Sequence, residues 1–178
     1  EIAGYPSLDD RSKLAVESEM KLEELIHVFD AANYMIVLQQ YDVVNDYYSY
    51  ILKEFQSREI YNNAGVNAIL SGLTILPEDH ESKKFEYPLQ LDGETRMNAK
   101  TRGTDIEAFG DAERAAFEAA IKKAIGYFEQ AKALDADYGT AYLNLACAYD
   151  ILGESEDAIY WAGKAKKIGK SNRNDKVI

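Results

Sequence analysis

The sequence predicts an all-α fold in which antiparallel helix pairs stack one against the next. Apolar residues recur every three or four positions over most of the chain, as in amphipathic helices. Small residues stand where paired helices would cross closely, and glycines or acidic residues mark helix ends. The chain has 178 residues, which is long enough for one domain with its own core.

The clearest helix pair spans residues 137–170. Its first helix ends at Leu152-Gly153, where glycine suits a helix C-cap. Its second helix begins with the acidic residues of Glu154–Asp157 and ends on lysines, and both charges suit the helix dipole. The pair carries a pattern of apolar, small and aromatic residues at Tyr142, Leu145, Ala146, Tyr149, Gly153, Ala158, Ala165 and Ile168.

This pattern resembles the signature of the tetratricopeptide repeat, a helix-turn-helix unit of about 34 residues. The resemblance implies a right-handed α-solenoid of about three such repeats with a partly extended insertion. Two positions depart from the family pattern: Lys170 stands where proline is frequent, and Ala162 replaces the usual aromatic residue. Neither departure would prevent the helix pair from forming.

We interpret residues 1–178 as a single repeat domain, and the spacing of the repeat pattern divides it into units. Two helices, over Ser12–Leu38 and Val43–Phe55, are expected at its start. The predicted units are repeat one at 24–57, a split repeat two at 58–72 plus 111–136, an insertion at 73–110, repeat three at 137–170 and a basic tail at 171–178.

The second repeat is interrupted. Gly65 and Ala124 hold equivalent small positions but lie 59 residues apart, whereas Ala146 and Ala158 are 12 apart. An insertion of about 47 residues follows from the assumed repeat period. Within it, Phe85, Tyr87, Leu89 and Leu91 alternate with polar residues and proline, which predicts an extended segment with one apolar edge.

The insertion has three possible roles at this point. It could close the solenoid by filling its own groove, form a lip of a partner-binding site, or be disordered. The candidate lip residues are the four apolar ones, Phe85, Tyr87, Leu89 and Leu91.

The charge and the cysteine content of the chain limit which partners and which cell compartments are compatible with it. The formal net charge of -11 argues against a nucleic-acid partner, which requires clustered lysine and arginine. A single cysteine, Cys147, excludes an internal disulfide and leaves a cytoplasmic or a periplasmic location open. No run approaches the roughly 18 apolar residues of a membrane span. The chain begins at Glu1 rather than at methionine, so we expect a processed chain or a part of a longer protein.

Catalytic and metal-binding patterns are not found in the sequence. His27 lies on a helix face with Glu23 and Glu24, and His80 lies among acidic residues, but neither has the spacing of a metal site. Cys147 has no neighbouring histidine, so we expect a small buried hydrophobic residue. We therefore predict no catalytic residue, no cofactor and no metal.

The resemblance implies that the first helix of each unit lines a concave groove. The groove residues predicted from it are Asn33, Asn62, Asn63, Val66, Leu143, Asn144 and Asp150. Asn33 and Asn63 resemble part of the clamp with which some family members hold a terminal carboxylate. The basic members of that clamp are replaced by Phe29, Thr140 and Asn144. The groove therefore suits an extended peptide or a helix whose backbone bonds to side-chain amides.

The leading functional expectation is a non-enzymatic scaffold module that binds a protein or peptide in its concave groove and is part of a larger protein or assembly. Its acidic surface favours a neutral or basic partner. Two alternatives remain: a structural or dimerisation domain whose insertion fills its own groove, and an accessory domain of an enzyme whose catalytic part lies outside this chain. The oligomeric state is left open.

Overall fold

The computed structural model describes residues 8–83, 86–92 and 110–174, and this part of the chain is all-α. It contains six α-helices, one short 3-10 helix and no strand within those ranges. The elements are α1 (Leu8–Val37), α2 (Tyr41–Glu54), α3 (Arg58–Ile75), η1 (Glu81–Lys83), α4 (Asp111–Leu134), α5 (Gly139–Ile151) and α6 (Ser155–Asn174).

Local sequence explains where the helices begin and end. The Ser57 side chain caps α3 by accepting a hydrogen bond of 3.2 Å from the Ile60 N–H. After α5, Gly153 has a φ of 79°, and the Glu154 N–H donates to the Tyr149 carbonyl at 2.9 Å. A left-handed backbone favours glycine, so the helix end predicted at Leu152-Gly153 is confirmed.

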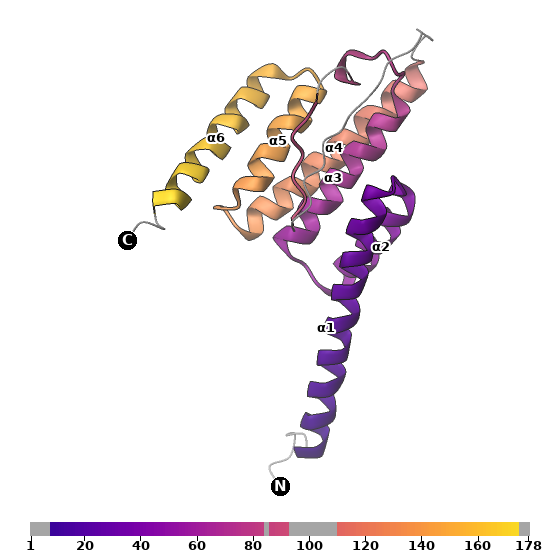
Figure 1. Cartoon of the computed structure of the whole chain (residues 1–178), viewed down its shortest axis with the longest axis vertical. Helices are drawn as coiled ribbons and strands as arrows, with labels where there is room; N and C mark the ends of the chain where they lie inside the picture. The colour runs from indigo at the N-terminus through magenta and orange to yellow at the C-terminus, as the bar shows by residue number, and fades with distance from the viewer. Residues whose placement is uncertain (1–7, 84–85, 93–109, 175–178) are drawn as a thin grey trace.

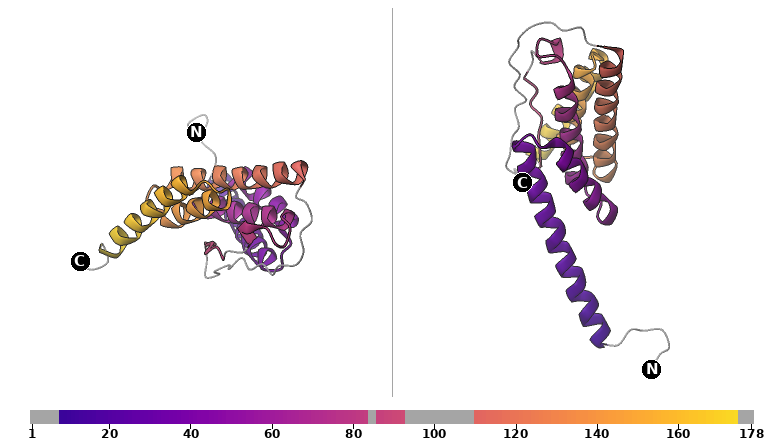
Figure 2. Two further views of the ribbon diagram at one scale, coloured as in Figure 1. Left: turned by 90° about the horizontal axis from the view of Figure 1, so that it is seen from above. Right: turned by 90° about the vertical axis from the view of Figure 1, so that its right-hand side faces the viewer.

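Contacts join the helices in sequential pairs, α1 with α2, α3 with α4, and α5 with α6. Further contacts of α2 with α3 and of α4 with α5 connect one pair to the next, and α3 also touches α5. Figure 1 shows α1 and α2 on one side of the molecule and α6 on the other. The first half of α1 projects beyond the packed helices in Figures 1 and 2.

The most extensive helix contact is between α3 and α4, although residues 76–110 separate them in the sequence. Gly65 of α3 lies against the ring of Phe128 of α4, which is fully buried. The two helices approach closely here because glycine has no Cβ. α3 and α4 therefore form a closely packed pair although the insertion separates them in the sequence.

One hydrophobic core runs through the helices and includes part of the insertion. Ile36, Ile69 and Phe128 have no exposed surface and represent α1, α3 and α4 in it. Tyr87, Leu89 and Leu91 of the insertion belong to the same cluster.

The helix bounds differ from the sequence prediction at a few ends. α3 continues to Ile75, beyond the expected end at Gly72, because Leu73 still packs into the core at 5% exposure. α1 begins at Leu8 rather than at Ser12, and α6 continues to Asn174 rather than ending at Lys170. Of the basic tail expected at 171–178, residues 175–178 lie outside the described residues.

We predict that Gly65→Ala destabilises the domain. A Cβ at this position would lie 2.8 Å from two ring atoms of Phe128, and the ring is held by the surrounding core. We expect a loss of about 1 to 3 kcal/mol in the free energy of unfolding, measured by chemical denaturation.

Gly126→Ala is the matched control, because a Cβ on this helical glycine of α4 would meet no atom within 4 Å. It should leave stability unchanged or raise it by up to about 1 kcal/mol, since alanine favours helix. Equal effects of the two substitutions would contradict the close approach of α3 and α4.

Candidate functional site

The described part of the insertion, residues 86–92, lies along α3 and α5. We call these seven residues the groove segment. Figure 1 shows it as a narrow trace between the two helices, and side-chain hydrogen bonds attach it to both. Asp92 lies near the start of α5 and Tyr87 near its end, so the segment runs antiparallel to α5.

Three asparagines bind the backbone of the groove segment. Asn144 accepts a hydrogen bond from the Gln90 N–H at 3.0 Å and donates to the Gln90 carbonyl at 2.9 Å. Asn62 donates to the same carbonyl at 2.7 Å. Asn63 accepts from the Asp92 N–H at 2.7 Å and donates to the Asp92 carbonyl at 3.2 Å. The backbone N–H and C=O groups of Gln90 and of Asp92 are thus all paired with side-chain amides.

The same asparagines also bond to one another, which fixes their orientation. Asn144 donates to Asn62 at 2.8 Å, and Asn62 donates to Asn63 at 3.1 Å. All three are fully buried. Because each of these three amides is bonded to another amide, the groups facing the segment are held in one arrangement.

Asn33 supports this network from behind, through hydrogen bonds to Asn63 and Tyr48. Its side-chain oxygen accepts from Asn63 at 2.9 Å and from the Tyr48 hydroxyl at 2.7 Å. Burial raises the pKa of Tyr48, so its hydroxyl remains a donor at neutral pH. Asn33 therefore orients Asn63 toward Asp92.

The apolar edge of the groove segment is buried. Tyr87, Leu89 and Leu91 are 6%, 1% and 5% exposed, whereas Glu86 and Pro88 are exposed. This is the alternation that the sequence predicts for an extended segment with one apolar edge. Phe85, the fourth candidate lip residue, lies outside the described residues.

The two ends of the segment are attached to opposite ends of α5. The Tyr138 hydroxyl donates to the Asp92 carboxylate at 3.0 Å. At the other end, burial raises the pKa of Tyr87, and the neighbouring Asp150 carboxylate, to which Tyr87 bonds, raises it further. The Ser82 hydroxyl of η1 donates to the Ile151 carbonyl at 3.0 Å.

The predicted groove residues are therefore only partly brought together. Asn62, Asn63 and Asn144 converge on one segment, with Asn33 behind Asn63. Val66 is fully buried. Leu143 is half-buried and Asp150 is exposed at the end of α5.

Sequence reasoning missed Tyr138 and Ser82, which attach the insertion to α5. Their partners are 46 and 69 residues away in the sequence, so no local pattern identifies them. Sequence reasoning also left open what occupies the groove. In the structure the chain itself does.

Cys147 lies in the same core cluster as the groove segment and is 6% exposed. Its charge state would affect the pKa of Tyr87, so the two groups are neighbours. Burial raises the pKa of the Cys147 thiol to about 12, and the nearby Asp150 carboxylate adds to this effect. A neutral, covered thiol is unreactive, which agrees with a packing role.

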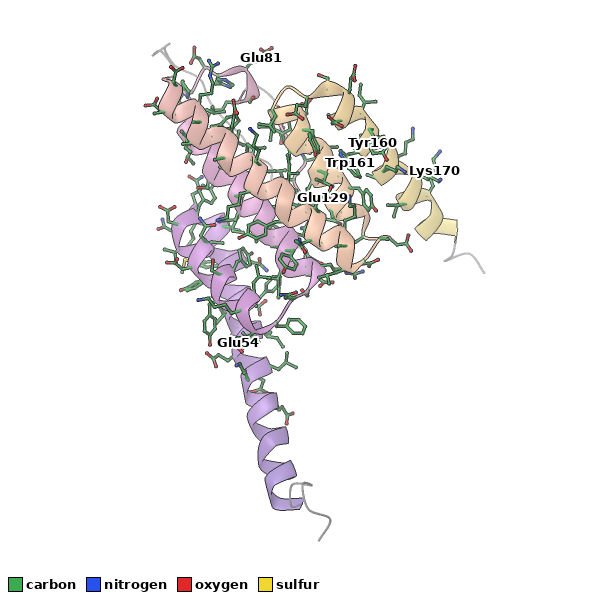
Figure 3. All side chains as sticks on the ribbon, turned by 180° about the vertical axis from the view of Figure 1, so that it is seen from behind. Glu54, Glu81, Glu129, Tyr160, Trp161 and Lys170 are labelled. Atoms are coloured by element: carbon green, nitrogen blue, oxygen red, sulfur yellow. The ribbon has the colours of Figure 1, made fainter. Side chains whose placement is uncertain are left out.

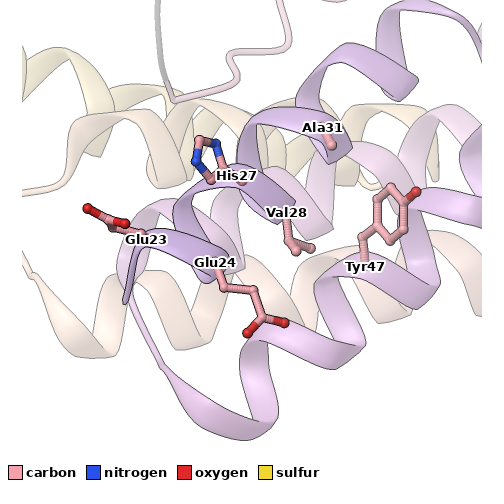
Figure 4. Close-up of a pocket in the computed structure, with 6 residues that line it drawn as sticks. All are labelled: Glu23, Glu24, His27, Val28, Ala31 and Tyr47. Atoms are coloured by element: carbon pink, nitrogen blue, oxygen red, sulfur yellow. The ribbon is translucent and has the colours of Figure 1, made fainter. Parts of the chain in front are cut away.

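Glu23, Glu24 and His27 line a shallow depression of α1 together with Tyr47 of α2 (Figure 4). Glu24 accepts a hydrogen bond of 2.8 Å from Tyr50, which occupies one of its oxygens. Among the residues that the structure describes, no group of three or more histidine, cysteine or acidic side chains is placed to hold a metal ion.

Two aromatic residues of α6 have lysine ammonium groups beside their rings. Figure 3 shows Tyr160 and Trp161 near Glu129 of α4. The Lys132 ammonium lies 4.2 Å from the Trp161 ring centre, and Lys164 lies 5.3 Å from that of Tyr160. Such cation–π contacts stabilise the packing of lysine and aromatic side chains, and Lys132 also pairs with Glu129.

Comparisons of this chain with protein families, with curated proteins and with solved structures returned no match. In the described ranges, none of the helices combines the length and apolar character needed to cross a membrane.

We predict that stability falls above pH 9 in part through Cys147. Its pKa rises from about 9 to about 12 on folding, so the unfolded chain loses the proton first as pH increases. The stabilisation that Cys147 gives to the folded state is fully present below pH 9 and is lost between pH 9 and 12. At pH 10 the loss should be roughly 1 kcal/mol in the free energy of unfolding.

Cys147→Ala is the control, since it removes the thiol but leaves the buried tyrosines, whose raised pKa values act at higher pH. Denaturation curves between pH 8 and 10 should slope less steeply for this variant. An identical pH dependence in both proteins would show that the thiol is not kept neutral by burial.

Proposed function

We infer that this chain is a non-enzymatic scaffold module that binds protein, built as a right-handed tetratricopeptide-like solenoid of three helix pairs. Support for the repeat architecture comes from the sequential pairing of α1 with α2, α3 with α4 and α5 with α6. The α3–α4 contact across the insertion agrees with a split second repeat. The groove then lies along α1, α3 and α5.

One observation carries the proposal: side-chain amides of α3 and α5 bind both backbone groups of Gln90 and of Asp92. A carboxamide presents the same donor and acceptor as a peptide group, so it can pair with any extended backbone. Such contacts give affinity for a polypeptide without depending on its side chains. The groove thus has the chemistry of a peptide site, and its present occupant is a part of the same chain.

A second candidate function is structural closure, in which the groove segment never leaves. Tyr87, Leu89 and Leu91 favour it, because each is buried in the main core. Burying three such side chains contributes several kcal/mol, at about 1.5 to 3 kcal/mol each. In that case the module would contribute to an assembly through its outer surfaces alone.

The reactivity of Cys147 separates the two candidates, because it is the single thiol of the chain and lies beside the segment. We expect Asn144→Ala to speed the reaction of Cys147 with an aromatic disulfide reagent about 10- to 100-fold at pH 8. The reason is that the Gln90 N–H loses its partner, at about 1 to 3 kcal/mol, while the Gln90 carbonyl keeps only its bond from Asn62.

Asn67→Ala is the matched control. Asn67 is another fully buried asparagine of α3, but it bonds to Tyr41 and Asn45 of α2. If the segment opens locally, Asn144→Ala should speed labelling far more than it lowers the global free energy of unfolding, and Asn67→Ala should not. If labelling follows global unfolding in both variants, the segment is a permanent part of the fold and peptide binding in this groove is rejected.

A further inference from the structure

The sequence of the groove segment indicates which peptides the groove would bind, an inference that rests on the protein-binding function proposed above. We propose that the groove recognises an extended peptide with apolar side chains at three alternate positions and an acidic residue directly after the third. The groove segment is then a tethered copy of that ligand. Its own pattern is Tyr87-x-Leu89-x-Leu91-Asp92.

Backbone recognition sets the conformation and the direction of the ligand. The amides bind Gln90 and Asp92, two residues apart, as a neighbouring strand would bind one edge of an extended chain. Neither position tolerates proline, because each N–H is used. Asp92 lies near the start of α5 and Tyr87 near its end, so a ligand runs antiparallel to α5.

Side-chain recognition sets the apolar pattern. Tyr87, Leu89 and Leu91 enter the core, whereas the side chains between them do not. Pro88 is exposed, and a proline restricts the residue before it to extended conformations. A ligand with proline at this intermediate position is therefore partly preorganised, which reduces the entropy lost on binding.

The acidic position is recognised at the start of α5. Tyr138 is buried and donates to the Asp92 carboxylate at 3.0 Å. The Arg58 guanidinium lies 4.8 Å from the centre of the Tyr138 ring, which brings a positive charge to this end of the groove. Arg58 is itself held by ion pairs with Glu59 and Asp135. Because those two carboxylates offset the charge of Arg58, the Tyr138 hydroxyl is the group that recognises the acidic residue.

The tether explains why a free peptide would compete poorly. A segment tethered to its site within the same chain acts at an effective concentration on the order of millimolar. A separate peptide of equal intrinsic affinity must reach a similar concentration to replace it. A measurable complex therefore requires that the tethered segment be weakened first.

The experiment uses the full chain with Tyr87→Ser, Leu89→Ser and Leu91→Ser together, and a fluorescein-labelled peptide EYPLQLD, the sequence of residues 86–92. A milder variant, Leu89→Ser alone, is made in parallel. Fluorescence polarisation measures binding, circular dichroism measures helix content, and Cys147 labelling reports whether the groove is open.

We expect the peptide to bind the triple variant at least 100-fold more tightly than the unaltered chain, and to slow Cys147 labelling at least 10-fold. Replacing the aspartate of the peptide by asparagine should weaken binding about 5-fold, and a peptide with its three apolar residues made adjacent should not bind. Adding Asn63→Ala and Asn144→Ala to the triple variant should abolish binding of the original peptide.

Two results would overturn the inference. If a helical variant with a reactive Cys147 binds none of the peptides, the groove is open but has no such preference, and the proposed scaffold function still stands. If neither variant keeps its helices, the segment is a permanent part of the fold. That second outcome also excludes peptide binding in the groove from the proposed function. Labelling of Cys147 that follows global unfolding would exclude it in the same way.

Discussion

The structure depends on how a buried, extended backbone is given hydrogen-bond partners within an all-helical domain. Helices satisfy their own backbone groups, and a segment packed between helices does not. The groove segment has its apolar edge in the core, so it cannot leave its backbone unpaired without a cost of about 1 to 3 kcal/mol per group. Asn62, Asn63 and Asn144 remove that cost by providing amide groups in place of a neighbouring strand.

These hydrogen bonds require that the surrounding helices hold the asparagines in fixed orientations. Asn63 reaches Asp92 in the correct orientation because Asn33 accepts its second N–H, and Asn33 is in turn fixed by Tyr48 of α2. The network therefore links the first helix pair to the insertion. The pair of α3 and α4 must also stay closed, and the close contact of Gly65 with Phe128 holds α3 against α4. A change in either place is expected to loosen the groove segment.

Much of this arrangement could be predicted from the sequence, and the reasons are local. Periodicity and capping residues located the helices, including the end of α5 at Gly153 and the start of α4 at Asp111, where the second part of repeat two was expected. The spacing of Gly65 and Ala124 indicated that distant segments pair. The asparagines were identified as groove residues, and the alternation around Leu89 indicated an apolar edge. Bonds between Asn144 and Gln90, 54 residues apart, leave no local pattern, so the sequence could offer filling of the groove by the insertion only as one of three alternatives.

The most direct test of this account is amide hydrogen exchange at Gln90 and Asp92, measured by NMR in the unaltered chain and in the Asn144→Ala variant. The account predicts that both amides exchange at least about 100-fold more slowly than in an unstructured peptide, and that the variant loses protection at Gln90 while the helices keep theirs. Exchange at the rate of an unstructured peptide, with the helices protected, would contradict the central claim that the asparagines hold the segment.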